Sequence, residues 1–272
     1  MPPTRAADRP LVVVKLGGSV ITRKREVERT RPKVIERLAR EVASVSDRPV
    51  ILLHGAGSFG HPGARRFGLA RPPPEGAKPS ARARGGAIVA AEVRRLHLTV
   101  LRELVRAGAA PASVPMATHA RNREGALASL DAAPFSEALD RGLLPVSFGD
   151  VVPDDAWTAS ILSADTIALA LVRKLPVGRV VFVSDVPGVL RGPAGGRRAV
   201  EPEVSEAVVE ALRPDAGVAD VTGGIRGKAI AMRAIAAAGA DAVLISGLTD
   251  GALPRAIRGE SVYGSWAHAG AR

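Results

Sequence analysis

The sequence contains no cysteine, which excludes disulfide bonds, thiolate metal sites and cysteine nucleophiles. Aromatic residues make up only 3% of the 272 residues, too few for the base-stacking surfaces of single-strand nucleic-acid binders. No apolar run approaches the roughly 20 residues that a membrane-spanning helix needs, and no apolar signal region follows the first ten residues. We therefore expect a cytoplasmic protein with neither a membrane nor a nucleic acid as its partner.

Lysine is also scarce. The net charge of +11 comes from 38 basic and 27 acidic residues, and only six of the basic residues are lysine. Arginine serves well as a general surface cation, so the remaining lysines are candidates for positions that need a compact ammonium group on a flexible stem. Three of them, Lys15, Lys24 and Lys228, lie within the glycine-containing motifs described below. Such a basic protein is suited to an anionic small substrate.

Apolar runs alternate with amphipathic segments along the chain. The apolar runs at 11–18, 49–55, 143–150, 178–189 and 241–246 predict buried strands, and helices are predicted at about 32–45, 85–107, 163–175 and 226–239. This alternation predicts an α/β fold, a three-layer αβα sandwich with a mostly parallel central sheet. Residues 62–84, rich in proline, arginine and glycine, predict a mobile excursion or lid. Ligands of such sheets bind where the carboxyl ends of the strands converge.

The loop from Gly55 to Gly60 follows one of these strands and matches G-x-G-x-x-G. A dinucleotide-binding turn needs a helix directly after it, and a nucleophile elbow around Ser58 needs the same. Pro62 and Gly63 argue against that helix, and the dinucleotide interpretation also lacks the apolar strand with a terminal acidic residue that should follow, so we reject both interpretations. Two remain equal on the loop alone: a cradle whose backbone N–H groups and His61 bind an anion, or a tight turn with a structural histidine.

Two further motifs contain lysine. Lys15 lies inside an apolar strand, where a charge is costly unless it faces a site, and a glycine turn with Ser19 follows it. The segment DVTGGIRGK places Lys228 in the first turns of a helix, a suitable position for binding phosphate. It is not a Walker A loop, because that pattern requires glycine where Thr222 stands and serine or threonine where Ala229 stands.

Together and in this order, these motifs resemble the amino acid kinase superfamily over about residues 11–264. The segments KLGGSVITRK and HGAGSFGHPG are similar in particular to those of the isopentenyl phosphate kinases, and His61 marks the branch that phosphorylates a phosphate group. The resemblance implies transfer of phosphate from ATP to isopentenyl phosphate. It also implies one domain, 1–272, with an acceptor-binding half at about 10–150 and a nucleotide-binding half at about 151–265.

The same resemblance implies roles for individual residues. The implied catalytic residues are Lys15, Lys24, His61, Asp165 and Lys228. The implied ATP site consists of Lys15, Gly17, Gly18, Ser19, Gly57, Asp185, Gly223 and Lys228. The implied acceptor site consists of Gly55, Ala56, Gly60, His61 and Ala164, the last standing where the family has glycine.

No carboxylate cluster marks a dedicated metal site, so we expect Mg²⁺ to be carried by ATP. A homodimer is the usual assembly of the family. The apolar tail of the acceptor is expected along the helix between Ile88 and Leu104, where Ala90 and Ala91 leave space. Two alternatives stay open: a phosphonate kinase of the same fold, and a non-catalytic regulator that senses nucleotide or binds nucleic acid.

Overall fold

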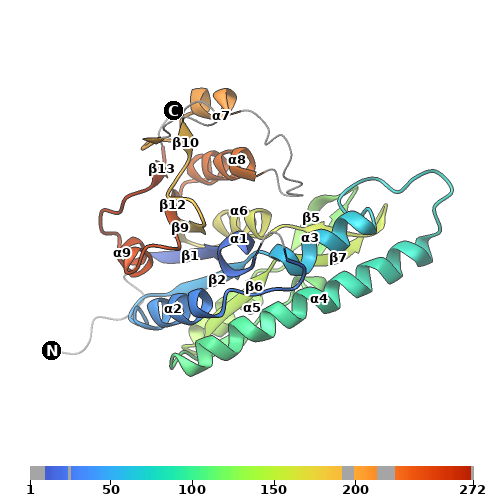
Figure 1. Ribbon diagram of the computed structural model, residues 1–272, viewed down its shortest axis with the longest axis horizontal. Coiled ribbons are helices and arrows are strands. Elements are labelled where there is room, and N and C mark those ends of the chain that lie inside the picture. Colours follow the sequence, from blue (N-terminus) through green and yellow to red (C-terminus); the bar gives the residue numbers. More distant parts are fainter. Residues whose placement is uncertain (1–9, 24–25, 192–198, 213–223, 271–272) are drawn as a thin grey trace.

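A seven-stranded sheet forms the centre of the protein (Figure 1), whose computed structural model describes residues 10–23, 26–191, 199–212 and 224–270. Its strand order is β13-β12-β9-β1-β2-β6-β3. The strands are β1 (Leu11–Leu16), β2 (Val50–His54), β3 (Pro111–Ser113), β6 (Leu144–Phe148), β9 (Val177–Ser184), β12 (Asp241–Ser246) and β13 (Ser265–Ala267). All neighbours pair in parallel except β13, which is antiparallel to β12. The predicted mostly parallel sheet is confirmed.

Helices cover both faces of this sheet. One face packs against α2 (Pro32–Ala43), α4 (Pro79–Arg106) and α9 (Ala252–Arg258), and the other against α5 (Ala133–Asp140), α6 (Ala164–Lys174) and α8 (Gly224–Ala237). Side chains alternate along a strand, so Val12 and Val14 join the first core while Val13 joins the second. The three-layer αβα architecture is therefore confirmed, and its central strands are mostly apolar because both faces are buried.

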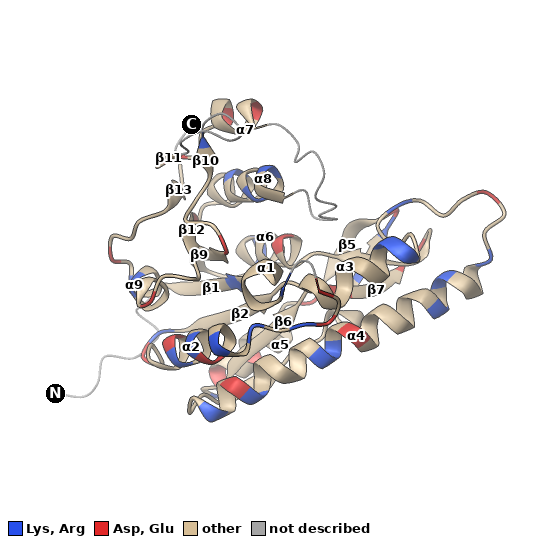
Figure 2. Cartoon of the chain, viewed as in Figure 1, with Lys and Arg blue, Asp and Glu red and all other residues tan. Residues whose placement is uncertain are grey.

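Helix α4 runs along the outside of the molecule, and its apolar stripe is buried as predicted. Val89, Val93, Leu96, Val100 and Leu104 are each no more than 2% exposed. Basic and acidic residues are distributed along the rest of the helix (Figure 2). The helix begins at Pro79, six residues before the predicted start at 85, with the proline in its first turn, where no intrahelical N–H is needed.

A second sheet was not predicted from the sequence. It has the order β5-β4-β7-β8, formed by β4 (Ala120–Arg123), β5 (Ala126–Leu130), β7 (Asp150–Asp154) and β8 (Thr158–Leu162), and it lies against α4. Exposed and buried residues are mixed along β5, and β4 is only four residues long, so neither carries the continuous apolar run that signals a buried strand. Tertiary pairing decides these strands.

The glycine loop after β2 continues directly into a helix, contrary to our prediction. Helix α3 (Gly57–Arg66) contains Pro62 and Gly63. Pro62 has no N–H to offer the carbonyl of Ser58, and that carbonyl instead accepts a hydrogen bond of 3.1 Å from the backbone N–H of Glu28. The neighbouring loop thus compensates for the proline. The argument that Pro62 prevents a helix was wrong.

The predicted excursion at 62–84 is consequently shorter, spanning only 67–78 between α3 and α4. Arg82 holds its first part in place. The Arg82 guanidinium donates to the carbonyl oxygens of Gly68, Leu69 and Arg71 at 3.0–3.1 Å and to that of Ala159 on β8 at 2.7 Å. Any opening of this segment must break these bonds or be confined to the residues after Arg71.

Five short elements complete the described chain: α1 (Gly18–Ile21), the 3-10 helix η2 (Met116–Thr118), β10 (Leu190–Arg191), β11 (Ala199–Val200) and α7 (Glu206–Ala211). Within the described ranges, no helix combines the length and the apolar character that crossing a bilayer requires.

Candidate active site

One pocket opens at the carboxyl ends of the central strands, as the sequence predicted. Predicted site residues from four separate segments line it: Lys15, Gly18, Ser19, Gly55, Ala56, Gly57, Gly60, His61, Ala164, Asp165 and Lys228. The parallel strands and the helices that follow them bring these segments together from positions more than 200 residues apart. Two predicted residues, Lys24 and Gly223, lie outside the described residues.

Lys15 is held at the end of the sheet by a carboxylate. Its backbone pairs with Leu53 of β2 and Phe182 of β9, and the residue is only 6% exposed. The Nζ atom lies 2.6 Å from Oδ1 of Asp165, which stands in the first turn of α6. A buried ammonium group needs such a partner, so the pair explains how a lysine is tolerated inside an apolar strand.

The N-terminus of α6 is fixed by Ser163. This residue is the N-cap, and its Oγ accepts a hydrogen bond of 3.0 Å from the N–H of Thr166. The cap positions both Asp165 and Ala164 at the wall of the pocket.

The two glycine turns of the site pack directly against each other. A Cβ atom on Gly18 would lie 2.4 Å from the backbone nitrogen of Gly57, so only glycine allows this approach. Gly57 also has a positive φ of 51°. The Thr22 hydroxyl joins the turns, since it donates to the Gly18 carbonyl at 2.7 Å and accepts from the Ser58 N–H at 3.0 Å. The turn after β1 and the turn after β2 therefore form one rigid unit.

Backbone donors are available in both turns. Among the described residues, no acceptor is bonded to the N–H groups of Gly18, Ser19, Ala56 or Gly57, and all four residues line the pocket. The Gly17 N–H differs, because it donates to the carbonyl of Val183 at 2.7 Å. The expectation that Gly17 supplies an N–H group to phosphate is thus corrected. Its part is steric, since a Cβ there would meet the Val183 oxygen at 2.9 Å.

Asp185 reaches the site through a serine. It follows β9, and its Oδ1 accepts from the Ser19 hydroxyl at 2.7 Å and from the Ser184 hydroxyl at 3.3 Å. Ser19 lines the pocket and Asp185 is not among the lining residues. Asp185 therefore holds the hydroxyl of Ser19, a residue that lines the pocket.

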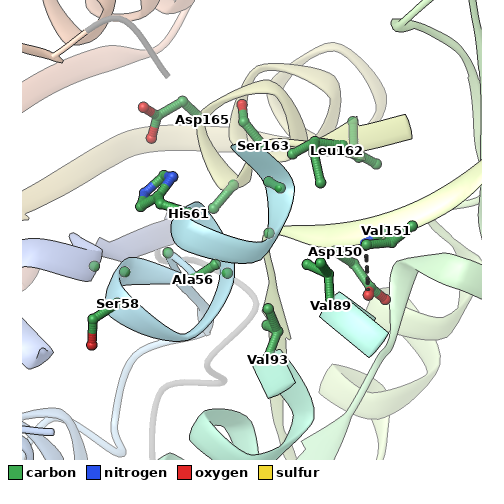
Figure 3. A pocket seen from close by; sticks show the side chains of 18 of the residues that line it. Ala56, Ser58, His61, Val89, Val93, Asp150, Val151, Leu162, Ser163 and Asp165 are labelled. Carbon is green, nitrogen blue, oxygen red and sulfur yellow. Dashed lines mark hydrogen bonds between the residues drawn. The ribbon is translucent and has the colours of Figure 1, made fainter. Parts of the chain in front are cut away.

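The pocket has a polar end and an apolar end (Figure 3). Asp165 and the half-buried His61 lie toward one end, while Val89, Val93 and Leu162 lie toward the other. In this apolar wall, Val89 and Val93 come from α4, and Val151, Ile161 and Leu162 come from the second sheet. Helix α4 lines this pocket, but Ala91 is exposed, and the pocket is lined by Val89 and Val93 on either side of the alanine pair. That the acceptor tail lies there stays a prediction.

Comparison with known proteins places this geometry in a family. A sequence model described as the amino acid kinase family matches residues 10–246. The isopentenyl phosphate kinase of Methanothermobacter thermautotrophicus is 30% identical over 260 residues, which cover 94% of this chain and 98% of that protein. The isopentenyl phosphate kinase of Haloferax volcanii is 36% identical over 231 residues, which cover 84% of this chain and 89% of that protein. The chain belongs to the isopentenyl phosphate kinases, within the amino acid kinase family.

Solved structures agree with this membership. One described as an X-ray structure of isopentenyl phosphate kinase superposes with a TM-score of 0.83 at 27% identity, covering 94% of this chain and 99% of that one. The product complex of the Thermoplasma acidophilum isopentenyl phosphate kinase superposes with a TM-score of 0.76 at 26% identity, covering 95% and 100%. The predicted fold class is confirmed along nearly the whole chain.

Two charged residues that line the pocket, Arg65 and Asp150, were assigned no role from the sequence. Arg65 stands four residues after His61 on α3, hence on the same helical face, and it also lines the pocket. The spacing would have indicated it had the helix been predicted. Asp150 is buried beside the apolar end, where Arg94 contacts its two oxygens at 3.2 and 3.3 Å. Burial raises the pKa of Asp150, while Arg94 and backbone N–H groups act in the opposite direction.

Proposed function

We propose that this protein transfers the γ-phosphate of ATP to isopentenyl phosphate and so forms isopentenyl diphosphate and ADP. The observation that carries the proposal is the continuity of one pocket. Two lysines, His61 and backbone N–H groups that are bonded to no acceptor among the described residues line the pocket, and a wall of valine, isoleucine and leucine lines its apolar end. A phosphate bearing a short hydrocarbon chain matches both ends at once.

Phosphoryl transfer to this acceptor needs no general base, because a phosphate oxygen is already anionic at neutral pH. That oxygen attacks the γ-phosphorus, and the bond from the γ-phosphorus to the bridging oxygen of ADP breaks. The enzyme must align two groups that repel each other and stabilise the charge that develops on the oxygens. We infer that Lys15 and Lys228 supply that stabilisation, with Asp165 holding the Lys15 ammonium group in position. Lys24 is expected to support the γ-phosphate or the acceptor from the first loop.

The division of donors follows from the two turns. We infer that Gly18 and Ser19 bind the β- and γ-phosphates, that Gly57 donates between donor and acceptor, and that Ala56 and His61 hold the acceptor phosphate. The close packing of Gly18 on Gly57 supports this arrangement, because it brings the two sets of N–H groups to adjacent positions. Asp185 and Gly223 are expected along the nucleotide, consistent with a nucleotide half at about 151–265 and an acceptor half at about 10–150.

Mg²⁺ is proposed to enter with ATP. Across the described residues, no three histidine, cysteine, aspartate or glutamate side chains gather into a metal site. Asp165 is paired with Lys15, and Asp185 accepts hydrogen bonds from two serines. These two carboxylates are thus already engaged by protein groups. We therefore expect the phosphates of ATP and water molecules to be the main ligands of Mg²⁺, an ion that usually keeps several waters when it binds.

The test is an acceptor screen with ATP, measured by coupled release of ADP. We expect turnover with isopentenyl phosphate and none with a fosfomycin-type phosphonate. His61→Ala should abolish turnover while ATP binding, measured by calorimetry, persists. Turnover of the phosphonate in place of isopentenyl phosphate would refute the proposal, as would full activity of the His61→Ala variant.

We also propose a homodimer, as expected for the family. Helix α4 supports it, because Leu98 and Val105 are 50% and 60% exposed and stand seven residues apart on its outer face. Light scattering after size exclusion should give twice the chain mass, and Leu98→Glu should shift it to one chain. Val27→Glu, at an apolar residue that is 68% exposed elsewhere, is the matched control. A monomeric wild type would refute the assembly.

A further inference from the structure

A row of three hydrogen-bonded side chains lies behind the turn that follows β2. His54, the last residue of β2, is fully buried, and its Nε2 lies 3.0 Å from Nδ1 of His97 on α4. Nε2 of His97 lies 2.8 Å from the hydroxyl of Ser113 on the edge strand β3. At the other end of the row, Nδ1 of His54 lies 3.1 Å from the carbonyl oxygen of Gly55. Both histidine rings also stack on or tilt against Phe148.

The carbonyl at one end decides the direction of every bond in the row. A carbonyl oxygen can only accept, so Nδ1 of His54 carries the hydrogen. In a neutral ring Nε2 must then accept, which makes His97 Nδ1 a donor and His97 Nε2 an acceptor from Ser113. Burial is the main cause that lowers the pKa of His54 to about 4 and that of His97 to about 3, so both rings are neutral near pH 7. The row therefore has one consistent set of tautomers.

The hydrogen bond from His54 to the Gly55 carbonyl also fixes the direction of the Ala56 N–H, which belongs to the same peptide group. The peptide between Gly55 and Ala56 is trans and planar, so its N–H points away from its carbonyl. The carbonyl is held toward the buried ring of His54, and the N–H of Ala56 therefore points the other way. Ala56 lines the pocket, and within the described chain this N–H is bonded to no protein acceptor.

Glycine makes this peptide plane easy to rotate. Gly55 carries no Cβ, so its ψ is poorly restrained, and a rotated peptide would turn a carbonyl oxygen toward a bound anion. An oxygen facing a phosphate repels it, while an N–H attracts it. The hydrogen bond from His54 opposes that rotation, and the rest of the row keeps the hydrogen on the nitrogen that makes it.

We propose that His54 is a positioning residue for the acceptor phosphate, holding the Gly55–Ala56 peptide with its N–H directed into the pocket. His97 and Ser113 maintain the tautomer of His54 that this task requires. None of these three residues lines the pocket described above, so their effect on a bound phosphate is indirect. The inference rests on the proposed function only in assigning the phosphate at Ala56 to the acceptor.

Two amide substitutions separate this role from simple packing. The amide nitrogen of asparagine is bonded to Cγ, as Nδ1 of histidine is, so His54→Asn retains a donor near the Gly55 carbonyl. Glutamine places its amide one bond further out, near Nε2, so His54→Gln keeps a polar contact with His97 and loses the donor to Gly55. The two variants thus differ mainly in the bond on which the proposal depends.

Steady-state kinetics with both substrates is the measurement. For His54→Gln we expect the KM for isopentenyl phosphate to rise by about tenfold to a hundredfold, the usual effect of losing a hydrogen bond to a charged group, while the KM for ATP changes by less than about twofold. His54→Asn should restore most of the acceptor affinity. Ser113→Ala, a milder change at the end of the row, should raise the same KM by a few-fold, about 1 kcal/mol or less.

Several results would overturn the inference. Equal losses in the asparagine and glutamine variants would do so, as would parallel increases in both KM values that follow a drop in melting temperature. If either His54 variant fails to fold, the Ser113→Ala variant remains as a test. An unchanged KM for isopentenyl phosphate in that variant would also overturn the inference. Calorimetric titration with inorganic phosphate separates the failure of this inference from the failure of the proposed function. If the wild type does not turn over isopentenyl phosphate, the proposed function is refuted. If wild type and His54→Gln bind inorganic phosphate with equal affinity, the positioning role is refuted.

Discussion

Acidification should destabilise this protein through the buried histidine pair, and the effect can be worked from the structure. The folded pKa values of about 4 for His54 and about 3 for His97 lie below the ordinary value of 6.5. At a pH between the folded pKa and 6.5, each histidine binds a proton in the unfolded chain but not in the folded chain. The stability that the pair contributes is therefore fully present above pH 6.5 and is lost as the pH falls toward 4.

The magnitude follows from proton linkage. Each histidine reduces the free energy of unfolding by about 1.4 kcal/mol per pH unit once the pH is well below 6.5. At pH 5.0 the loss is about 2 kcal/mol for each histidine relative to pH 7.5, or about 4 kcal/mol for the pair. Typical domains have only about 5–15 kcal/mol of stability in total, so the effect is large enough to measure.

Urea denaturation at pH 7.5, 6.5, 5.5 and 5.0 is the assay. The double variant His54→Asn/His97→Gln keeps polar side chains in the row but removes both titrating rings, so it should lose about 4 kcal/mol less than the wild type between pH 7.5 and 5.0. His268→Asn, which removes a histidine that is 56% exposed, is the matched control for losing one imidazole from the chain. A double variant with the same pH dependence as the wild type would refute the reasoning.

Three substitutions test the rest of the site. Lys15→Met should reduce kcat by about two to three orders of magnitude and, by removing the cation that lies 2.6 Å from the buried carboxylate of Asp165, lower the melting temperature; a variant with wild-type turnover contradicts the role. Gly57→Ala and Gly68→Ala both place a side chain at a positive φ, 51° and 63°, but only at Gly57 would the new Cβ meet an atom, the Thr22 hydroxyl oxygen at 2.2 Å. We expect Gly68→Ala to lower the free energy of unfolding by about 1 kcal/mol and Gly57→Ala to lower it by more. Equal urea midpoints for the two variants would show that the close approach is unimportant. Val93→Phe should reduce kcat/KM for geranyl phosphate more than for isopentenyl phosphate, and an unchanged ratio would place the tail elsewhere.

The sequence alone predicted most strands of the central sheet, and most of the site residues that it indicated line one pocket. Strands buried on both faces must be apolar throughout, so runs such as 11–16 and 241–246 are visible without a structure. Lys15 was identifiable for the converse reason, since a charge inside such a run is too costly unless a site uses it. His61 was identifiable through the motif that surrounds it.

The tertiary structure decided what depends on partners distant in the chain. Helix α3 passes through Pro62 because the N–H of Glu28, from another loop, satisfies the freed carbonyl. The second sheet forms by pairing of short strands with mixed polarity, and it supplies three residues of the apolar wall, Val151, Ile161 and Leu162.

The row from Ser113 through His97 to His54 depends on three separate elements, β3, α4 and β2, packing together. Local propensity and hydrophobic pattern determine which segments become strands and helices. Hydrogen bonds and ion pairs between segments far apart in sequence exist only once the chain has packed, and here they hold Ser19 and Lys15 at the pocket.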